Sequence, residues 1–472
     1  KEVFAEAVAS VDEERARRVM DVGQWRKGYL GPVRDIVAAG AESGKNALNI
    51  ASTGLASMRR HLTFVRDRDE IALDASFDLT PATTFNTGRI QGTAPRVEEL
   101  SIPYRGEALR GDALKRRLDA WVAKGVMEES SSVAIESLID NPGWLDLTDQ
   151  DFVLVGAASQ MGPLGPLLRW GARIAALDLP IAHIWDRIAT TAREGAGLLT
   201  FPTRATEEDA DAQLGNAGAD LLLELPEVWN WMQSLDRPFV LGNYVYADGA
   251  DFLRLAGAVD ALIDRTAAAG RLGALAYLAT PTDVYAVPDS LASEVRARKE
   301  RSLLSGSLKV LTRGALYQPN YPDTVHGDEA EWAISDCLVP IQGPNYALAK
   351  AMQRWRAVVA REEDITTSAN VAPATYTVSV TKNRMLAAAY SQAHRFGIEI
   401  FEPETSRILM AALLVHDLRT SSSSAPQGHP FDLFVDKAVH GGIWRSPYEP
   451  RSVLPIALAR GMLPGRRSQH AP

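Results

Sequence analysis

Short apolar runs alternate with amphipathic stretches through the middle of the chain. Runs rich in Val, Leu, Ile and Ala are typical of strands buried on both faces, and stretches with apolar residues every three or four positions predict helices. The predicted strands are Phe152–Val155, Arg173–Leu177, Gly197–Thr203, Pro238–Tyr244, Leu272–Thr280 and Thr367–Ala372. The predicted helices that separate them include Ile181–Arg193, Glu227–Leu235, Ala250–Ala268 and Tyr346–Arg361. Strands that alternate with helices predict an α/β fold with a parallel, doubly wound sheet.

The first 150 residues have a different pattern, which predicts a mainly helical N-terminal region. Up to about residue 75, apolar positions recur at helical spacing among charges (Phe4, Val8, Val11, Ile50, Leu55 and Met58). From Ile71 to Tyr104 the sequence is rich in Thr, Gly and Pro, which indicates a few short strands or a long wrapping loop. Asp112 then begins an amphipathic helix that ends near Gly125.

The stretch Asp151–Pro180 is the most informative part of the chain. Its first strand breaks at Gly156 into a turn of small residues, Gly162 and Pro163 open a helix, and the second strand ends at Asp178. Glycine lets the backbone approach a pyrophosphate, a helix N-terminus offers free N–H groups to it, and an acid after the second strand can accept from ribose hydroxyls. The pattern therefore favours dinucleotide binding over an ordinary βαβ unit with a tight turn.

Two further segments interrupt or follow the alternation. Residues 283–343 combine a charged helix (Ser290–Leu304) with loop, and they read as an insertion into the catalytic domain, which we place at residues 151–418. We expect this insertion to cover the substrate pocket, because both of its ends lie next to the predicted site. The C-terminal tail, 419–472, contains Trp444, Pro447, Tyr448 and Pro450 and is expected to fold over the domain or over a second subunit of a homo-oligomer.

Composition and charge narrow the classes of function. The net charge of -9 and the lack of basic runs argue against nucleic-acid binding, and no apolar run reaches the roughly 18 residues of a membrane span. The start of the chain has no secretory pattern, and the single cysteine, Cys337, permits no internal disulfide or multi-cysteine metal site. We expect a cytoplasmic protein in which Cys337 is a small buried residue. The histidines show no metal-binding spacing, and no G-x-S-x-G motif indicates a hydrolase.

Several motifs resemble those of the short-chain dehydrogenase/reductase family. The turn G-A-A-S-Q-M-G is similar to the glycine turn of that family, with Gly156 and Gly162 as its first and last glycines and Gln160 in place of the middle one. Tyr346-x-x-x-Lys350 matches the catalytic Tyr-x-x-x-Lys, on the helix before the expected strand. The resemblance extends to the proline turn, where Ala374 replaces the usual glycine, and to the closing helix Phe401–Val415. It covers residues 151–418 and implies a Rossmann-like fold.

The resemblance implies roles for the catalytic residues. Tyr346 would be the acid/base, and Lys350, one helical turn away, would lower the pKa of the tyrosine and hold the nicotinamide ribose. The serine of the family would be replaced by Thr280 or Thr282 at the strand end, with Ser335 as the alternative closer in sequence. The asparagine of the family would fall near Asn243. The competing interpretation is a tyrosine packed by its ring beside a solvated lysine.

The resemblance also implies the cofactor contacts. The expected residues are Gly156, Ser159, Gln160, Met161, Gly162, Asp178, Thr203, Pro373 and Thr375. NAD is favoured over NADP, because Asp178 would accept from the ribose 2′-hydroxyl and repel a 2′-phosphate. Arg173 or Arg204 could reverse this preference by reaching that phosphate.

The sequence thus predicts an NAD(H)-dependent oxidoreductase that interconverts a carbonyl compound and an alcohol of low molecular weight by transferring hydride from or to the nicotinamide. The alternative is a nucleotide-binding regulatory or scaffolding protein with the same fold that has lost turnover.

Overall fold

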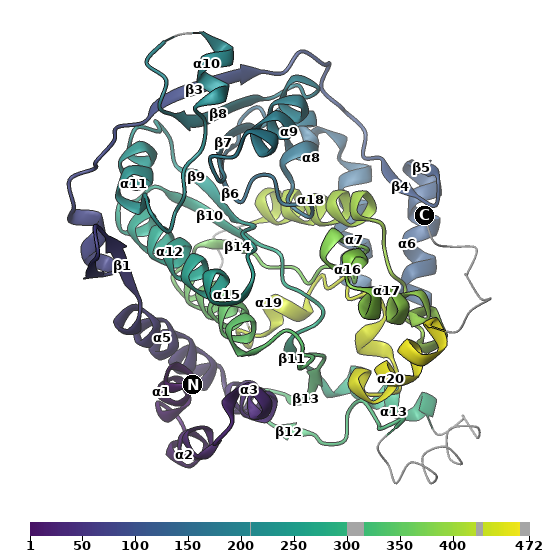
Figure 1. Cartoon of the computed structure of the whole chain (residues 1–472). Coiled ribbons are helices and arrows are strands. Elements are labelled where there is room, and N and C mark those ends of the chain that lie inside the picture. Colours follow the sequence, from purple (N-terminus) through teal and green to yellow (C-terminus); the bar gives the residue numbers. More distant parts are fainter. Residues whose placement is uncertain (208, 300–315, 422–427, 463–472) are drawn as a thin grey trace.

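A computed structural model describes residues 1–207, 209–299, 316–421 and 428–462 of the chain. At its centre is a seven-stranded sheet with the order β14-β10-β9-β6-β7-β8-β3 (Figure 1). All neighbouring pairs are parallel except β3 and β8. The strands are β3 (Asn86–Gln91), β6 (Asp151–Val155), β7 (Arg173–Leu177), β8 (Leu198–Thr203), β9 (Phe239–Asn243), β10 (Leu272–Tyr277) and β14 (Thr366–Ser368). The predicted doubly wound, Rossmann-like sheet is therefore confirmed.

Helices cover both faces of the sheet, because side chains alternate in direction along each strand. In β6, Phe152 and Leu154 point into one core and Val153 and Val155 into the other. The first core is covered by α6 (Gly111–Ala123), α7 (Glu129–Asp140), α8 (Leu164–Arg169), α9 (Ala182–Arg193) and α18 (Pro403–Thr420). The second is covered by α5 (Gly44–His61), α11 (Leu225–Gln233), α12 (Gly249–Ala268) and α15 (Pro344–Glu362), with α12 and α15 side by side (Figure 1).

The N-terminal region is helical as predicted, but it packs into the second core of the central sheet and is not a separate unit. Helices α1 (Glu2–Ala9), α2 (Glu13–Asp21), α3 (Trp25–Gly28) and α4 (Leu30–Ala41) precede α5, whose Gly54 faces the ring of Trp355 in α15. The region after the hairpin β1 (Thr63–Arg66) and β2 (Asp69–Ala72) supplies β3, an edge strand of the main sheet. Taking the sheet to begin at residue 151 was wrong, because β3 is largely polar and lacks the apolar run of a central strand. A short hairpin of β4 (Ile102–Tyr104) and β5 (Glu107–Leu109) leads into α6.

The insertion 283–343 contains a second, antiparallel sheet with the order β11-β13-β12. Its strands are β11 (Val284–Pro288), β12 (Val325–His326) and β13 (Glu331–Asp336). Helix α13 (Asp289–Lys299) is the described part of the predicted helix Ser290–Leu304, whose remainder lies outside the described residues. The small sheet went unpredicted, since its pairing joins segments about 50 residues apart.

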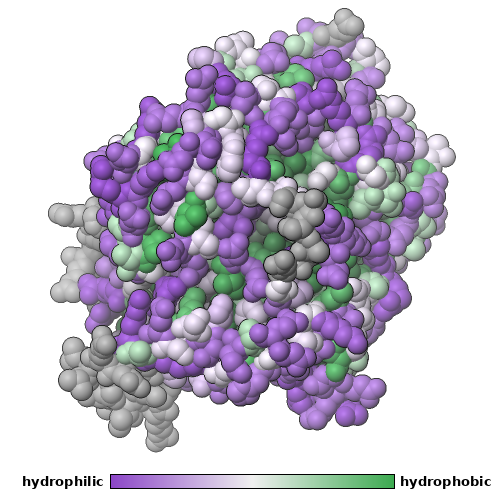
Figure 2. Space-filling model, turned by 180° about the vertical axis from the view of Figure 1, so that it is seen from behind, coloured by the Kyte–Doolittle hydropathy of each residue, from purple (hydrophilic) through white to green (hydrophobic). Residues whose placement is uncertain are grey.

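The described part of the C-terminal tail folds over the domain, which is the first of the two arrangements expected for it. Trp444 is buried in the second core, and the Val439 amide donates to the Val371 carbonyl beyond β14. The tail contains α19 (Asp432–Val435) and α20 (Pro450–Gly461), and α20 packs against α17 (Arg384–Ser391). Seen from behind, the surface is mostly hydrophilic, with apolar residues in small separate groups (Figure 2). Among the described helices, none has the length and apolar character needed to cross a membrane.

A buried ionic network fixes the tail to the start of α7. The Glu128 carboxylate accepts from His440 Nε2 at 2.9 Å and from Arg445 at 2.6 and 3.0 Å. Burial raises the pKa of Glu128, but the hydrogen bonds from His440 and Arg445 outweigh it and bring this pKa to about 2. Burial lowers the pKa of His440, and Glu128 opposes this only in part.

These shifts predict a loss of stability in acid. Glu128 stabilises the fold above its ordinary pKa of about 4.3, and this contribution disappears as the pH falls toward 2. His440, whose folded pKa is also depressed, loses its contribution as the pH falls below about 6.5. For Glu128 alone the expected loss is about 3 kcal/mol. Thermal unfolding from pH 7 to pH 2 should show wild type and Glu128→Gln converging in acid; a constant difference between them would contradict the assignment.

Candidate functional site

The predicted site residues lie at the carboxyl ends of the central strands. Strand β6 has β7 on one side and β9 on the other. The connection that follows β6 crosses the face of the first core, and α12, which follows β9, lies on the opposite face. In a doubly wound sheet the crevice at such a switch point is where ligands bind.

The glycine turn after β6 is tightly closed. Gly156 has a φ of +75°, and an added Cβ would meet the Tyr244 backbone at 2.9 Å, so this position requires glycine. The amides of residues 156, 157, 159 and 162 donate to backbone carbonyls, and that of 158 donates to Asp178. Two amides of the turn, those of Gln160 and Met161, have no hydrogen-bond acceptor among the described residues. Helix α8 begins at Leu164, later than predicted, since Pro163 is its N-cap residue.

Asp178 lies against this turn from the end of β7. Its carboxylate accepts from the Ala158 amide at 2.8 Å and from the Leu179 amide at 2.9 Å. Burial raises its pKa, while the two amides and the nearby Arg187 lower it in part. The guanidinium of Arg187 donates to the Ala158 carbonyl at 2.5 Å, so Arg187 is the arginine beside the turn.

The other expected cofactor contacts at this end have internal partners. Arg173 pairs with Asp151 at 2.7 Å at the start of its strand, and Arg204 pairs with Glu224 and donates to the Gly218 carbonyl. Neither is therefore placed to hold a 2′-phosphate. Thr203 is fully buried, and its hydroxyl donates to the Gln213 carbonyl at 2.8 Å.

Tyr346 meets both candidate threonines at the carboxyl end of β10. The Thr280 and Thr282 hydroxyls are 3.1 Å apart, and Gln342 Nε2 donates to the Thr282 hydroxyl at 3.2 Å. Burial raises the pKa of Tyr346 to about 12, and hydrogen bonds with Thr280, Gln342 and Thr282 offset this only in part. The expected lowering of this pKa by Lys350 was wrong, because burial dominates.

Lys350 is directed to other partners. Its Nζ donates to Gln353 at 2.9 Å and lies 5.7 Å from the centre of the Phe252 ring. Burial lowers the pKa of Lys350 to about 8. The same Phe252 ring lies 5.7 Å from that of Tyr346, so Phe252 contacts both members of the Tyr-x-x-x-Lys motif. Lys350 is thus neither a solvated surface lysine nor a partner of the phenol.

The remaining predicted residues are positioned as follows. Asn243 is buried at the end of β9, where its Oδ1 accepts from the Val245 amide at 3.4 Å. Beyond β14, the Thr375 hydroxyl donates to the Pro373 carbonyl at 2.8 Å and lies 2.7 Å from Ser406 Oγ. Ser335 is in β13, buried beside Cys337, and burial raises the pKa of this thiol to about 12. The expectation that Cys337 is buried is confirmed.

The segment after β14 reaches back to the glycine turn. Gln160 Oε1 accepts from the Val378 amide at 2.9 Å. Val378 begins α16 (Val378–Lys382), which is followed by α17. The chain after Thr377 therefore closes over the position where the middle glycine of the family motif would lie.

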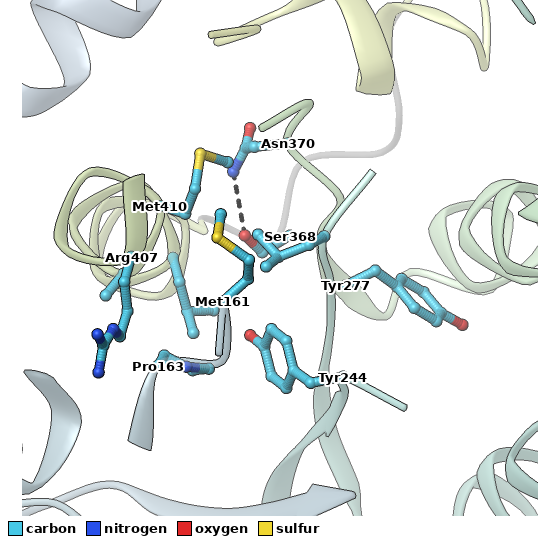
Figure 3. Close-up of a pocket in the computed structure, with 11 residues that line it drawn as sticks. Met161, Pro163, Tyr244, Tyr277, Ser368, Asn370, Arg407 and Met410 are labelled. Atoms are coloured by element: carbon cyan, nitrogen blue, oxygen red, sulfur yellow. Dashed lines mark hydrogen bonds between the residues drawn. The ribbon is translucent and has the colours of Figure 1, made fainter. Parts of the chain in front are cut away.

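A small cavity lies beneath the turn, on the side of α18 (Figure 3). Met161, Pro163 and Tyr244 lie around it, and Tyr277 points away. Its volume of about 10 Å³ is room for one water molecule, so it is not the ligand pocket itself. At its base Ser368 and Asn370 both donate to the Asp417 carboxylate, at 2.6 and 2.7 Å, which ties β14 to α18.

Sequence reasoning missed three side chains of the site. Gln342 contacts Thr282, Phe252 joins Tyr346 to Lys350, and Tyr246 lies 5.5 Å from Phe252, ring centre to ring centre. Tyr246 lies three residues after the end of β9, and this position near a strand end was a usable signal. Nothing in the sequence singled out Phe252 or Gln342, because neither belongs to a motif and both reach the site only through tertiary contacts.

No protein-family model and no curated protein matches this chain. Within the described ranges, no group of three or more His, Cys, Asp or Glu residues is arranged to hold a metal ion.

Proposed function

We propose that the protein is an NAD(H)-dependent oxidoreductase acting on a carbonyl or alcohol group. The observation that carries this proposal is the meeting of Tyr346 with Thr280 and Thr282 at the end of β10, two strands from the glycine turn of β6. A hydroxyl donor beside two further hydroxyls can orient a substrate oxygen and exchange a proton with it. The resemblance to the short-chain dehydrogenase/reductase family supports the same arrangement.

The residues around the crevice fit a dinucleotide in type and order. The free amides of Gln160 and Met161 would bind the pyrophosphate, Asp178 the adenosine ribose, and the segment Pro373–Thr375 the nicotinamide end. The nucleotide, when bound, supplies or accepts the hydride.

The chain's own contribution is a proton and the position of the substrate oxygen. Because the pKa of Tyr346 is about 12, its phenol is protonated at neutral pH. In this state it can donate a proton to a carbonyl oxygen during reduction. Thr280 and Thr282 hold that oxygen by hydrogen bonds.

Calorimetric titration with NAD and NADP tests the cofactor assignment. NAD should bind more tightly, because Asp178 repels a 2′-phosphate and Arg173 and Arg204 are engaged elsewhere. Asp178→Asn should narrow the difference between the two nucleotides, and Asp211→Asn, on α10 (Ala210–Gly215), serves as a control that should not. Tighter binding of NADP would overturn the preference and point to Arg187, and no binding of either would overturn the proposal.

A second function, nucleotide-dependent regulation without turnover, is favoured by one observation. Lys350 hydrogen bonds to Gln353 and packs on Phe252, which removes it from the phenol that it would assist. Under this alternative the protein binds NAD but transfers no hydride, and replacement of Tyr346 leaves both properties as they are.

A further inference from the structure

Exposed apolar side chains are concentrated at the carboxyl ends of the strands. Of the twelve large hydrophobic residues that are exposed in the described chain, seven lie in the loops and short helices of this edge: Leu179, Ile181, Leu223, Tyr246, Ile341, Val378 and Met385. Single exposed apolar residues are ordinary on protein surfaces, whereas their concentration around a candidate site marks a surface that binds.

Two of these residues flank the hydroxyl groups of the site. Tyr246 is 58% exposed, and its ring packs at 5.5 Å on Phe252, which in turn packs on Tyr346. Ile341 is 55% exposed and precedes Gln342, whose side chain donates to the Thr282 carbonyl and hydroxyl. A flat aromatic surface and an aliphatic one therefore stand next to the proton donor.

The two cations near Tyr346 are engaged with other groups of the chain. The side chains that affect its pKa most are Thr280, Tyr246, Gln342 and Thr282, which are uncharged at neutral pH. Arg354 forms an ion pair with Asp283 at the start of the insertion, and the Lys350 ammonium lies on the Phe252 ring. A carboxylate or phosphate on a substrate would lose its hydration here, and it would gain a cation only if Lys350 or Arg354 left its present contacts.

We propose that the exposed surface formed by Tyr246 and Ile341 beside Tyr346 binds an uncharged carbonyl compound or alcohol with a flat apolar body, and that the Tyr246 ring is the contact that selects it. This inference rests on the proposed function for the reaction, but the binding preference can be measured without turnover. Aromatic faces stack on flat apolar groups with little loss of conformational entropy, and Tyr246 is held from behind by Phe252.

The binding test compares benzyl alcohol with 4-(hydroxymethyl)benzoate by ligand-observed NMR on the full chain. The uncharged ring should bind at least about tenfold more tightly, and Tyr246→Ala should abolish that preference while Tyr246→Phe keeps it. Because Tyr246 is exposed, its loss should leave the fold intact. Met20→Ala removes a residue of similar exposure on α2 and should change nothing. Equal binding of both compounds, or an unchanged preference in Tyr246→Ala, would overturn the inference.

The turnover test separates this inference from the proposed function. With NADH, benzaldehyde should be reduced with a kcat/KM at least about tenfold above that of 4-carboxybenzaldehyde, and Tyr246→Ala should erase the ratio with nucleotide affinity unchanged. Selective binding without any hydride transfer would overturn the oxidoreductase proposal and leave the apolar site standing. Faster reduction of the carboxylate would overturn the substrate class and leave the oxidoreductase standing.

Discussion

Tyr346→Phe should reduce turnover by about two to four orders of magnitude while nucleotide binding persists. The substitution keeps the ring and its packing on Phe252, and removes the hydroxyl that meets Thr280 and Thr282. Since this hydroxyl is the proposed proton donor, the chemical step should slow and the affinity for NAD should stay the same. Single-turnover hydride transfer and calorimetric binding, measured on the same preparation, distinguish the two effects.

Matched variants give this experiment its controls. Tyr317→Phe removes a hydroxyl from a ring that packs on Tyr448 instead, and it should leave turnover unchanged. Lys350→Met should weaken nucleotide binding as well as turnover if the amine leaves Gln353 for the ribose in the complex, and should affect neither if it is only a packing residue. Unchanged hydride transfer in Tyr346→Phe would remove Tyr346 from the mechanism and leave only the fold.

The central sheet could be predicted from the sequence because its information is local. Each strand from β6 to β10 is an apolar run, and the predicted bounds of Arg173–Leu177 are those of β7. Strand β3 and the small sheet of the insertion could not be predicted in this way, for two different reasons. β3 is an edge strand with polar positions, and β11 and β13 recognise each other only across a long connection.

The candidate site was predictable where it depends on topology. The end of β10 and the start of α15 had to be neighbours in this fold, and Thr280, Thr282 and Tyr346 are accordingly close. The charge state was not predictable, because helical spacing places Lys350 near Tyr346 without specifying its direction. Phe252, on another helix, offers the amine a ring face, and burial then sets both pKa values. Such effects depend on tertiary neighbours that the periodicity of the sequence does not encode.

The largest effect on stability is expected at a buried ion pair behind the site. Arg356 of α15 donates to both oxygens of Asp260 of α12, at 2.7 and 3.0 Å, and each side chain is only 6% exposed. Arg356→Met keeps most of the side-chain volume but leaves the carboxylate buried, with only the 3.5 Å contact to Arg59. Breaking a buried pair in this way typically costs about 3 to 5 kcal/mol, and we expect the free energy of unfolding in urea to fall by about 3 kcal/mol because Arg59 remains.

Helix α12, which carries Asp260, also provides the control for this prediction. Arg254 and Asp251 of α12 form an ion pair at 3.4 Å in which the side chains are 64% and 63% exposed, so Arg254→Met should cost less than about 0.5 kcal/mol. Arg356→Met combined with Asp260→Leu should be more stable than Arg356→Met alone, since the unpaired charge is then gone. Equal costs for the buried and exposed arginines would refute the argument. Because α15 carries Tyr346 and α12 carries Phe252, loss of this pair should also loosen the contact between these two rings.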